Sequence, residues 1–210
     1  MTVSVDTSHQ QSVDERYRLA LRRLMRLRRN RLTPQQQRQA GLAISQRLLA
    51  HPKIRNADHI ALYSAFDGEV NTQPLCQQLW QQGKQLYLPR LNRQQPGQLL
   101  FTLYQPHHKL QRNSYGILEP LSALSELVSL QQLTLLLVPV VAFDANCRRL
   151  GMGGGYYDRT LNDYFLKYPS LTPPFLMGLA HYCQQVASLP TAPWDWPLQA
   201  VMTPQQLFLK

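Results

Sequence analysis

The sequence predicts an α/β protein, a single three-layer domain in which helices flank a mostly parallel central sheet. Apolar runs typical of buried strands alternate along the chain with segments whose apolar residues recur at helical spacing. The 210 residues suffice for one sizeable core, and no linker-like stretch divides them. We therefore expect one domain over residues 14–210, preceded by a flexible polar leader at residues 1–13.

Two helices are expected at the N-terminal end. The first starts at Asp14 and carries two neighbouring stripes, an apolar one of Tyr17, Leu21, Leu24 and Met25 and a basic one of Arg18, Arg22, Arg26 and Arg29. The second helix reaches about Ala50. Its start combines Thr33 as N-cap, Pro34 as first helical residue and Gln36 as capping-box partner.

Strands and helices alternate after residue 52. The expected strands span 59–66, 85–90, 97–104 as an edge strand, 133–143, 174–180 and 199–203. The expected helices span 72–83, with Thr72 as N-cap and Gly83 as terminator, then 121–130 and 156–167. The run at 133–143 is the strongest strand signal, because its apolar character predicts a strand covered on both faces.

The formal net charge of +10 at pH 7 is concentrated in one segment. Eight of the 22 Lys and Arg residues are arginines between positions 16 and 31, and the remaining 14 nearly balance the 12 acidic residues. Such a helix could bind RNA, or be a solvated basic face. The near-neutral remainder is unlike a surface that coats nucleic acid. We expect small-molecule partners and no nucleic acid.

Composition also bears on location and assembly. No apolar run is long enough to span a bilayer, and the N-terminus lacks the pattern of a secretory signal. The three cysteines, Cys76, Cys147 and Cys183, lie far apart, which argues against a disulfide framework and a structural zinc site. We expect a cytoplasmic monomer with no membrane partner.

A glycine-rich segment, RRLGMGGGYYDR at 148–159, joins the strongest predicted strand to a helix. In open α/β sheets, ligands bind at the carboxyl edge that this loop leaves. Adjacent glycines let successive N–H groups converge on an anion, and the following helix adds its dipole, so phosphate is the expected guest. The segment matches neither the Walker A pattern nor strict G-x-G-x-x-G, and a glycine turn required only for packing is the alternative.

Three carboxylates and two arginines are candidates for the same site. Asp158 lies in the first turn of the helix and Asp195 in the proline-fixed segment APWDWP, and Mg²⁺ prefers one or two carboxylates with phosphate oxygens. Helix-dipole stabilisation explains Asp158 equally well, and a turn explains Asp195. Arg18 and Arg22 lie one turn apart and could reach phosphates together. Glu69, in FDGEV, could accept hydrogen bonds from a heterocycle or be a surface acid.

These segments resemble a known family. The run VPVVAFDANCRRLGMGGGYYDR at 138–159 resembles the R-L-G-x-G-x-G-Y-Y-D signature of the 5-formyltetrahydrofolate cyclo-ligase family. Further segments resemble the family in the same order: Arg18-x-x-x-Arg22, L-T-P-x-x-Q at 32–37, AFDGEVNT at 65–72, YGILEP at 115–120 and L-P…D at 189–195. The resemblance covers nearly all of the chain from residue 16 onward.

The resemblance implies an α/β fold and a Mg²⁺-dependent reaction that turns ATP and 5-formyltetrahydrofolate into 5,10-methenyltetrahydrofolate, ADP and phosphate. The residues it implies for ATP are Arg18, Arg22, Arg149, Leu150, Gly151, Met152, Gly153, Gly154, Gly155, Tyr156 and Tyr157. Of these, the catalytic residues are Arg149, Gly153, Gly155 and Tyr156. The folate residues are Ser64, Glu69, Tyr115 and Tyr156, and the metal ligands are Asp158 and Asp195.

The chain departs from the family pattern in three places. Met152 and Gly154 stand where some members have arginine and lysine, so backbone N–H groups, Arg149 and the N-terminal arginines must do more of the phosphate binding. Ser64 stands where some members have leucine. Two other classes remain possible from the residues alone, a nucleic-acid-binding module built on the arginine helix and a phosphosugar- or nucleotide-binding protein of similar layered fold.

Overall fold

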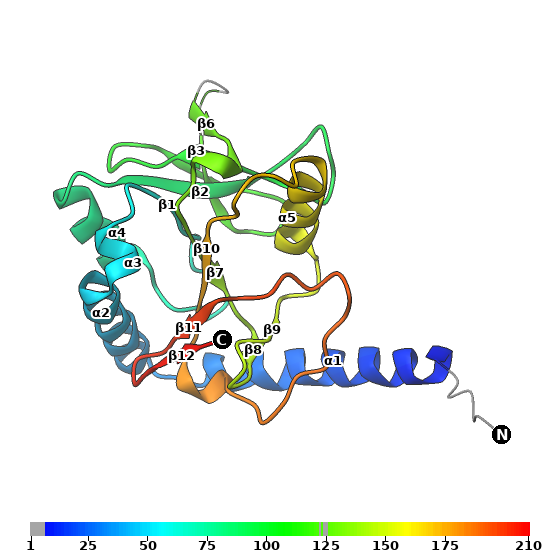
Figure 1. The fold of residues 1–210 in the computed structure, drawn as a ribbon. Helices are drawn as coiled ribbons and strands as arrows, with labels where there is room; N and C mark the ends of the chain where they lie inside the picture. The colour runs from blue at the N-terminus through cyan, green and yellow to red at the C-terminus, as the bar shows by residue number, and fades with distance from the viewer. Residues whose placement is uncertain (1–6, 122, 124–125) are drawn as a thin grey trace.

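An eight-stranded sheet forms the centre of the computed structural model, which describes residues 7–121, 123 and 126–210 (Figure 1). Its strand order is β12-β11-β10-β7-β1-β2-β3-β6. Along this order, each neighbouring pair from β11 to β2 is parallel. The pairs β12 with β11, β3 with β2 and β6 with β3 are antiparallel. Their bounds are β1 His59–Ala61, β2 Gln85–Leu91, β3 Leu99–Leu103, β6 Leu127–Val128, β7 Leu135–Pro139, β10 Phe175–Leu179, β11 Ala200–Met202 and β12 Leu207–Leu209. The predicted α/β class with a mostly parallel sheet is confirmed.

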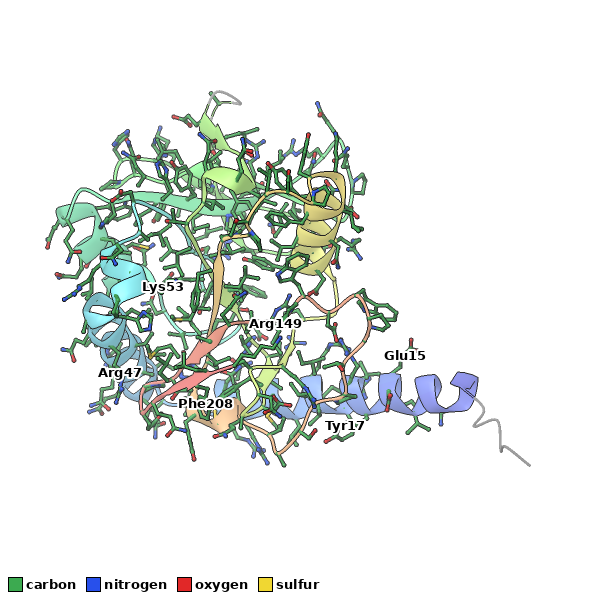
Figure 2. All side chains as sticks on the ribbon, viewed as in Figure 1. Glu15, Tyr17, Arg47, Lys53, Arg149 and Phe208 are labelled. Carbon is green, nitrogen blue, oxygen red and sulfur yellow. The ribbon has the colours of Figure 1, made fainter. Side chains whose placement is uncertain are left out.

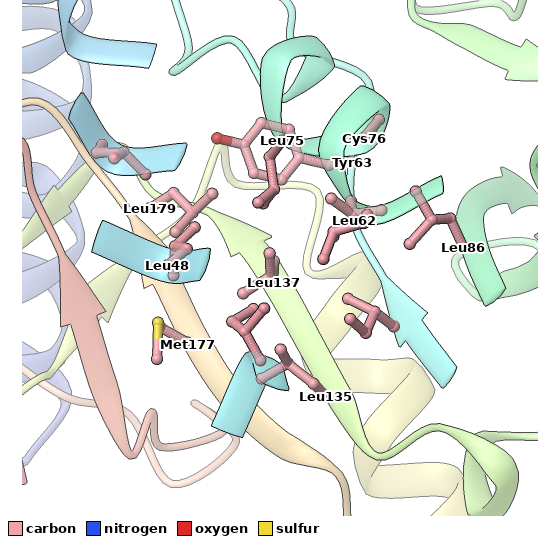
Figure 3. Packing of buried hydrophobic residues seen from close by; sticks show 14 of the residues in the cluster. Leu48, Leu62, Tyr63, Leu75, Cys76, Leu86, Leu135, Leu137, Met177 and Leu179 are labelled. Carbon is pink, nitrogen blue, oxygen red and sulfur yellow. The ribbon is translucent and has the colours of Figure 1, made fainter. Parts of the chain in front are cut away.

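Helices cover both faces of the sheet, and β7 shows why. Leu135 and Leu137 belong to a cluster with α2 (Pro34–Ala50), α3 (Pro52–Arg55) and α4 (Gln73–Gln81) (Figure 3). Leu136 and Val138 point the other way, into a cluster with α5 (Tyr156–Lys167). Alternate residues of a strand face opposite sides, so an apolar strand needs cover on both. The result is the predicted three-layer arrangement (Figure 1).

The N-terminal helix α1 (Thr7–Asn30) runs along one side of the molecule and projects beyond it (Figure 1). The expected start at Asp14 is wrong, because residues 7–13 contain neither glycine nor proline and the helix includes them. The rest of the expected leader, residues 1–6, lies outside the described residues. Leu21 and Met25 are buried, whereas Tyr17 and Leu24 are exposed, so only half of the predicted apolar stripe faces the core.

Several expected elements differ from the structure where contacts with distant segments intervene. The helix expected at 121–130 is wrong over its second half, where β6 and the 3-10 helix η2 (Leu130–Gln132) lie; residues 122, 124 and 125 of that segment lie outside the described residues. Because β6 pairs with β3, the expected edge strand is not an edge. Thr72 stands at the N-cap of α4, but its hydroxyl donates to the carbonyl of Tyr63 (2.8 Å) instead of capping. The capping box of Thr33 and Gln36 on α2 is confirmed.

The predicted long strands are also shorter than expected. The run at 59–66 is a strand only over β1, and 133–143 divides into β7 and a short β8 (Ala142–Phe143) that pairs with β9 (Arg149–Leu150). At the break between β7 and β8, the side-chain amide of Gln184 donates to the carbonyls of Val140 and Val141. A second hairpin joins β4 (Leu110–Arg112) and β5 (Leu118–Pro120). No helix formed by the described residues has the length and apolar content needed to cross a bilayer.

Candidate functional site

Two loops and the basic stripe of α1 meet near the carboxyl end of β7. One is the FDGEV loop (residues 66–70), which follows β1, and the other is the glycine loop (residues 151–155), which follows β9 and leads into α5. The guanidinium of Arg29 on α1 contacts both loops and the carbonyl of Val140, the residue after β7. This is the edge at which parallel sheets bind ligands.

The glycine loop needs its glycines for reasons of geometry. Gly153 and Gly155 have φ values of +105° and +63°, which L side chains rarely adopt. A Cβ on Gly154 would lie 2.9 Å from the ring of Tyr156. The hydrogen bonds of the described chain include none donated by the amide N–H groups of these three glycines. The loop therefore offers unused donors beside the N-terminus of α5, as an anion site requires.

Two arginine–aspartate pairs flank the glycine loop. Arg18 donates to both carboxylate oxygens of Asp195, at 2.7 and 2.9 Å. Arg149 donates to Asp158 at 2.5 Å, and the amide N–H of Trp196 donates to the same oxygen at 2.9 Å. Both candidate metal ligands thus lie where α5 meets the 192–196 segment, and each is paired with an arginine assigned to phosphate by the resemblance.

Burial and neighbouring charges shift the pKa values of the groups at this site. Burial alone would raise the pKa of Asp195, but the hydrogen bonds from Arg18 and from the Ala192 N–H outweigh it and hold that pKa below its ordinary value. Burial and the neighbouring Arg18 charge lower the pKa of Arg22. The Arg149 side chain is 6% exposed, and its Nε–H has no hydrogen-bond partner among the described residues. Figure 2 shows Arg149 between α1 and α5. A buried unpaired donor costs about 1–3 kcal/mol unless a ligand satisfies it.

Asp158 and Asp195 suit a metal cation only if a bound anion supplies further ligands. Among the described residues no group of three or more His, Cys, Asp or Glu side chains can hold a metal. Asp158 and Asp195 would supply two ligands at most. Mg²⁺ accepts that number when phosphate oxygens and water complete its octahedron. The donor set therefore suits Mg²⁺ bound together with a phosphate chain.

The basic stripe of α1 lies beside this site, with Arg29 buried, Arg18 and Arg22 half-buried and Arg26 exposed. Arg22 Nε donates to the carbonyl of Gly151 at 2.9 Å. Arg26 and Arg29 both reach the carboxylate of Asp67 in the FDGEV loop, at 2.6 and 2.9 Å. The alternative of a solvated basic face does not hold for Arg18, Arg22 and Arg29, which are buried or half-buried and bond to Asp195, the glycine loop and the FDGEV loop, respectively.

Glu69 is half-buried at the end of the FDGEV loop and is not the surface acid of the alternative interpretation. Its carboxylate accepts from the N–H of Phe66 (3.1 Å), whose carbonyl accepts from the N–H of Glu69 (3.0 Å). Burial raises the pKa of Glu69 to about 7, against the opposing charge of Arg29. Burial, and secondly the charge of Glu69, raises the pKa of Tyr157 in α5.

The two remaining aromatic candidates lie together. The hydroxyls of Tyr115 and Tyr156 are 2.8 Å apart, and their rings meet edge to face. Tyr115, from the β4–β5 hairpin, therefore borders the glycine loop. Ser64 is half-buried in the segment between β1 and the FDGEV loop.

Three residues of the site were missed by the sequence predictions: Arg29, Asp67 and His181. Arg29 was visible only as the last member of the basic stripe, and Asp67 only as a neighbour of Glu69. His181 is 2% exposed, and its Nε2 lies 3.1 Å from the carbonyl of Gly68. Burial lowers the pKa of His181 to about 4, so the neutral imidazole donates to that carbonyl. No sequence signal pointed to this contact.

Two surface hollows lie away from these loops. One, of about 370 Å³, is lined by Arg28, Tyr182, Cys183, Gln185, Val186 and Ala187. The other, of about 210 Å³, lies by Trp80 and Tyr104. Neither contains a site residue that the sequence predicted.

Comparison with known proteins agrees with this geometry. The 5-formyltetrahydrofolate cyclo-ligase family matches residues 14–204. The 5-formyltetrahydrofolate cyclo-ligase of Escherichia coli K12 is 42% identical over 185 residues, 88% of this chain and 99% of that protein. The Haemophilus influenzae protein of the same name is 44% identical over 181 residues, 86% and 94% of the two chains. The NMR structure of Aquifex aeolicus 5,10-methenyltetrahydrofolate synthetase superimposes with a TM-score of 0.76 at 27% identity, covering 91% of this chain and 92% of that one. The chain belongs to the 5-formyltetrahydrofolate cyclo-ligase family.

Proposed function

We propose that this chain uses ATP and Mg²⁺ to convert 5-formyltetrahydrofolate into 5,10-methenyltetrahydrofolate, with release of ADP and phosphate. The family supports cyclo-ligase activity on 5-formyltetrahydrofolate; the nucleotide, the metal, the residue roles and the steps below belong to the proposal. The enzyme acts as a monomer in the cytoplasm in this proposal.

The reaction needs a better leaving group than the formyl oxygen. Transfer of the γ-phosphoryl group of ATP to that oxygen forms an O–P bond and releases ADP. N10 of the folate then attacks the formyl carbon, a C–N bond forms, the phosphate leaves with the former formyl oxygen, and N10 loses its proton. The protein has to align two substrates and neutralise charge on the moving phosphoryl group, which is the usual demand of phosphoryl transfer.

The phosphate chain of ATP lies on the glycine loop in this proposal. The unused N–H groups of Gly153, Gly154 and Gly155 bind its oxygens, and the free Nε–H of Arg149 turns to the same anion. Arg18 and Arg22 approach from α1. Gly153, Gly155 and Tyr156 also border the formyl group of the folate.

The ion pairs of the free protein then exchange partners. Arg18 and Arg149 leave Asp195 and Asp158 for phosphate oxygens, and the two carboxylates become free to hold Mg²⁺. The metal, when bound, supplies charge that offsets the negative charge of the triphosphate. Each arginine that moves from a carboxylate to a phosphate keeps a charge-assisted hydrogen-bond partner in both arrangements.

The folate lies against the FDGEV loop. An ionised Glu69 accepts hydrogen bonds from the amino and N–H groups of the pterin, and Ser64, Tyr115 and Tyr156 border it. The single observation that carries the proposal is the glycine loop, whose amide donors are unused among the described residues. The buried unpaired Arg149 Nε–H precedes it in the sequence, and the two arginine-held carboxylates lie at the start of α5 and in the 192–196 segment.

The direct test is to mix the purified chain with ATP, Mg²⁺ and 5-formyltetrahydrofolate and to follow the near-ultraviolet absorbance of the methenyl product. We expect product only when all three are present and none after chelation of Mg²⁺ with EDTA. Titration calorimetry with ATP and Mg²⁺, with and without the folate, measures the nucleotide site separately. A chain that releases no heat with ATP in either case would overturn the proposal.

A further inference from the structure

Arg29 is a buried cation that touches both the FDGEV loop and the glycine loop. Its side chain is 0% exposed. Nε donates to the carbonyl of Asp67 at 2.7 Å and Nη2 to the Asp67 carboxylate at 2.9 Å. The same guanidinium lies 3.8 Å from the sulfur of Met152 in the glycine loop and 3.5 Å from the carbonyl of Val140. One side chain thus joins the FDGEV loop, the end of β7 and the glycine loop.

A buried arginine is a costly way to fill this space. Moving a guanidinium out of water costs several kcal/mol of solvation free energy. The attraction to a single carboxylate offsets this cost only when the geometry of the ion pair is good. Apolar side chains of similar volume often stabilise such positions as well or better. The planar guanidinium fork of Arg29 instead fixes an orientation, since its N–H groups bind both the backbone carbonyl and the side-chain carboxylate of Asp67.

The segment that Arg29 holds is a strained one. Asp67 has φ +50°, a left-handed conformation that costs a non-glycine residue about 1–3 kcal/mol. Three donors from α1 reach it, because Arg26 and Asn30 join Arg29 at its carboxylate. The turn at Asp67 and Gly68 directs the chain so that Glu69 bonds back to Phe66. The orientation of Glu69 therefore depends on Asp67.

We infer that Arg29 is a positioning residue: it holds the FDGEV loop and the glycine loop at one separation, so that folate on Glu69 faces the phosphoryl group on the glycine amides. The inference rests on the proposed function of the two loops. Its stronger contacts are with the FDGEV loop, at 2.7 and 2.9 Å, and its contact with the glycine loop is a single sulfur at 3.8 Å. Loss of the fork therefore disturbs folate placement more than nucleotide binding.

The test is Arg29→Lys, which keeps the charge and loses the fork, against Arg23→Lys on the exposed part of the same helix. We expect Arg29→Lys to lower kcat/KM for 5-formyltetrahydrofolate about 10- to 100-fold per folded molecule, as a displacement of about 1 Å does. The calorimetric Kd for ATP without folate should stay within about threefold. Arg23→Lys should match the wild type in both measurements.

A second variant keeps the inference testable if Arg29→Lys does not fold. Asp67→Asn retains a residue that tolerates left-handed backbone and removes the carboxylate that the fork grips. We expect the same pattern, with folate kinetics impaired and ATP affinity kept. Either variant with folate kinetics equal to Arg23→Lys, whatever its melting temperature, would overturn the inference. A wild type that forms no methenyl product would instead overturn the proposed function.

Discussion

The FDGEV loop and the glycine loop border the same site, but they are held in opposite ways. The FDGEV loop is fixed by side chains from other elements: the buried Arg29 and the exposed Asn30 bind Asp67, and the buried His181 binds the carbonyl of Gly68. These contacts all lie within the chain. A methyl group on Gly68 would come within 2.1 Å of the Asn30 side-chain oxygen, which shows how closely the loop is packed.

The glycine loop is held mainly by arginines that grip its carbonyl groups. Arg22 binds the carbonyl of Gly151, and Arg159 binds that of Gly154. Met152 is exposed, and the flanking carboxylates are occupied by Arg18 and Arg149. The difference suggests a division of labour. Under the proposed function, the folate side is fixed by contacts within the chain, while the phosphate side holds its cations on internal partners that the ligands would replace.

The largest effect should come from a carboxylate on the phosphate side. We expect Asp158→Asn to lower kcat/KM for ATP about 100- to 1,000-fold, equivalent to about 3–4 kcal/mol of barrier. The melting temperature should fall little, because the Asn oxygen can still accept from the N–H of Trp196. Steady-state kinetics at saturating folate and thermal unfolding measure the two. Loss of the fold with normal activity per folded molecule would contradict the assignment of Asp158.

Removal of one cation from the same side should have a smaller effect. Arg22→Ala should raise the apparent KM for ATP about 10-fold or more and leave the affinity for folate nearly unchanged, because Arg22 donates its hydrogen bond to the glycine loop and not to the FDGEV loop. Arg23→Ala, one residue along and exposed, is the matched control. An equal rise of KM for both substrates would remove Arg22 from the phosphate site.

The folate side should respond to pH. Glu69, with its pKa raised to about 7 by burial, must be ionised to accept from a pterin, so kcat/KM for the folate should fall about 10-fold between pH 8 and pH 6. Glu69→Gln should lower this parameter and remove its dependence on pH in that range. A wild-type profile flat from pH 8 to pH 6 would exclude an essential Glu69 carboxylate.

The same shift has a consequence for stability. Since the folded pKa is above the ordinary 4.5, the folded state binds more protons than the unfolded state between about pH 4.5 and 7, and this group lowers the free energy of unfolding as pH rises through that window. Glu69→Gln should therefore be more stable than the wild type at pH 8, by about 1–3 kcal/mol, and not at pH 4. Denaturant unfolding at the two pH values measures the difference.

The smallest effect is expected at the surface contact between Tyr115 and Tyr156. Tyr115→Phe removes only the hydroxyl that meets Tyr156, and Tyr115 is 55% exposed. An exposed hydrogen bond contributes about 0.5–1 kcal/mol, so KM for the folate should change no more than about threefold. A change above tenfold, in the same kinetic assay, would mean that the hydroxyl contacts the substrate.

Much of the architecture could be predicted because it follows from local patterns. Apolar runs located β7 and β10, and the signals at Thr33 and Pro34 located the start of α2. The errors fall where a tertiary contact overrides the pattern. The 121–130 segment has helical character, but β3 offers an open edge that β6 pairs with.

The helix α1 shows the same limit on a single element. Its sequence predicts an apolar face and a basic face, and the simplest expectation buries the first and solvates the second. In the structure Arg29 is fully buried and Leu24, a member of the predicted apolar stripe, is 44% exposed. The neighbouring segments determine which face of a helix is buried. Here the two loops present carbonyl and carboxylate acceptors to the arginines of α1.

The sequence by itself determined the α/β class, the glycine loop with its need for left-handed backbone, and the stripe of arginines at helical spacing, because each is a property of neighbouring residues. Only the tertiary structure decided that Arg18 pairs with Asp195 across 177 residues and that Arg29 joins two loops. Contacts between distant segments depend on how the whole sheet brings its carboxyl ends together, and that arrangement has no local signal.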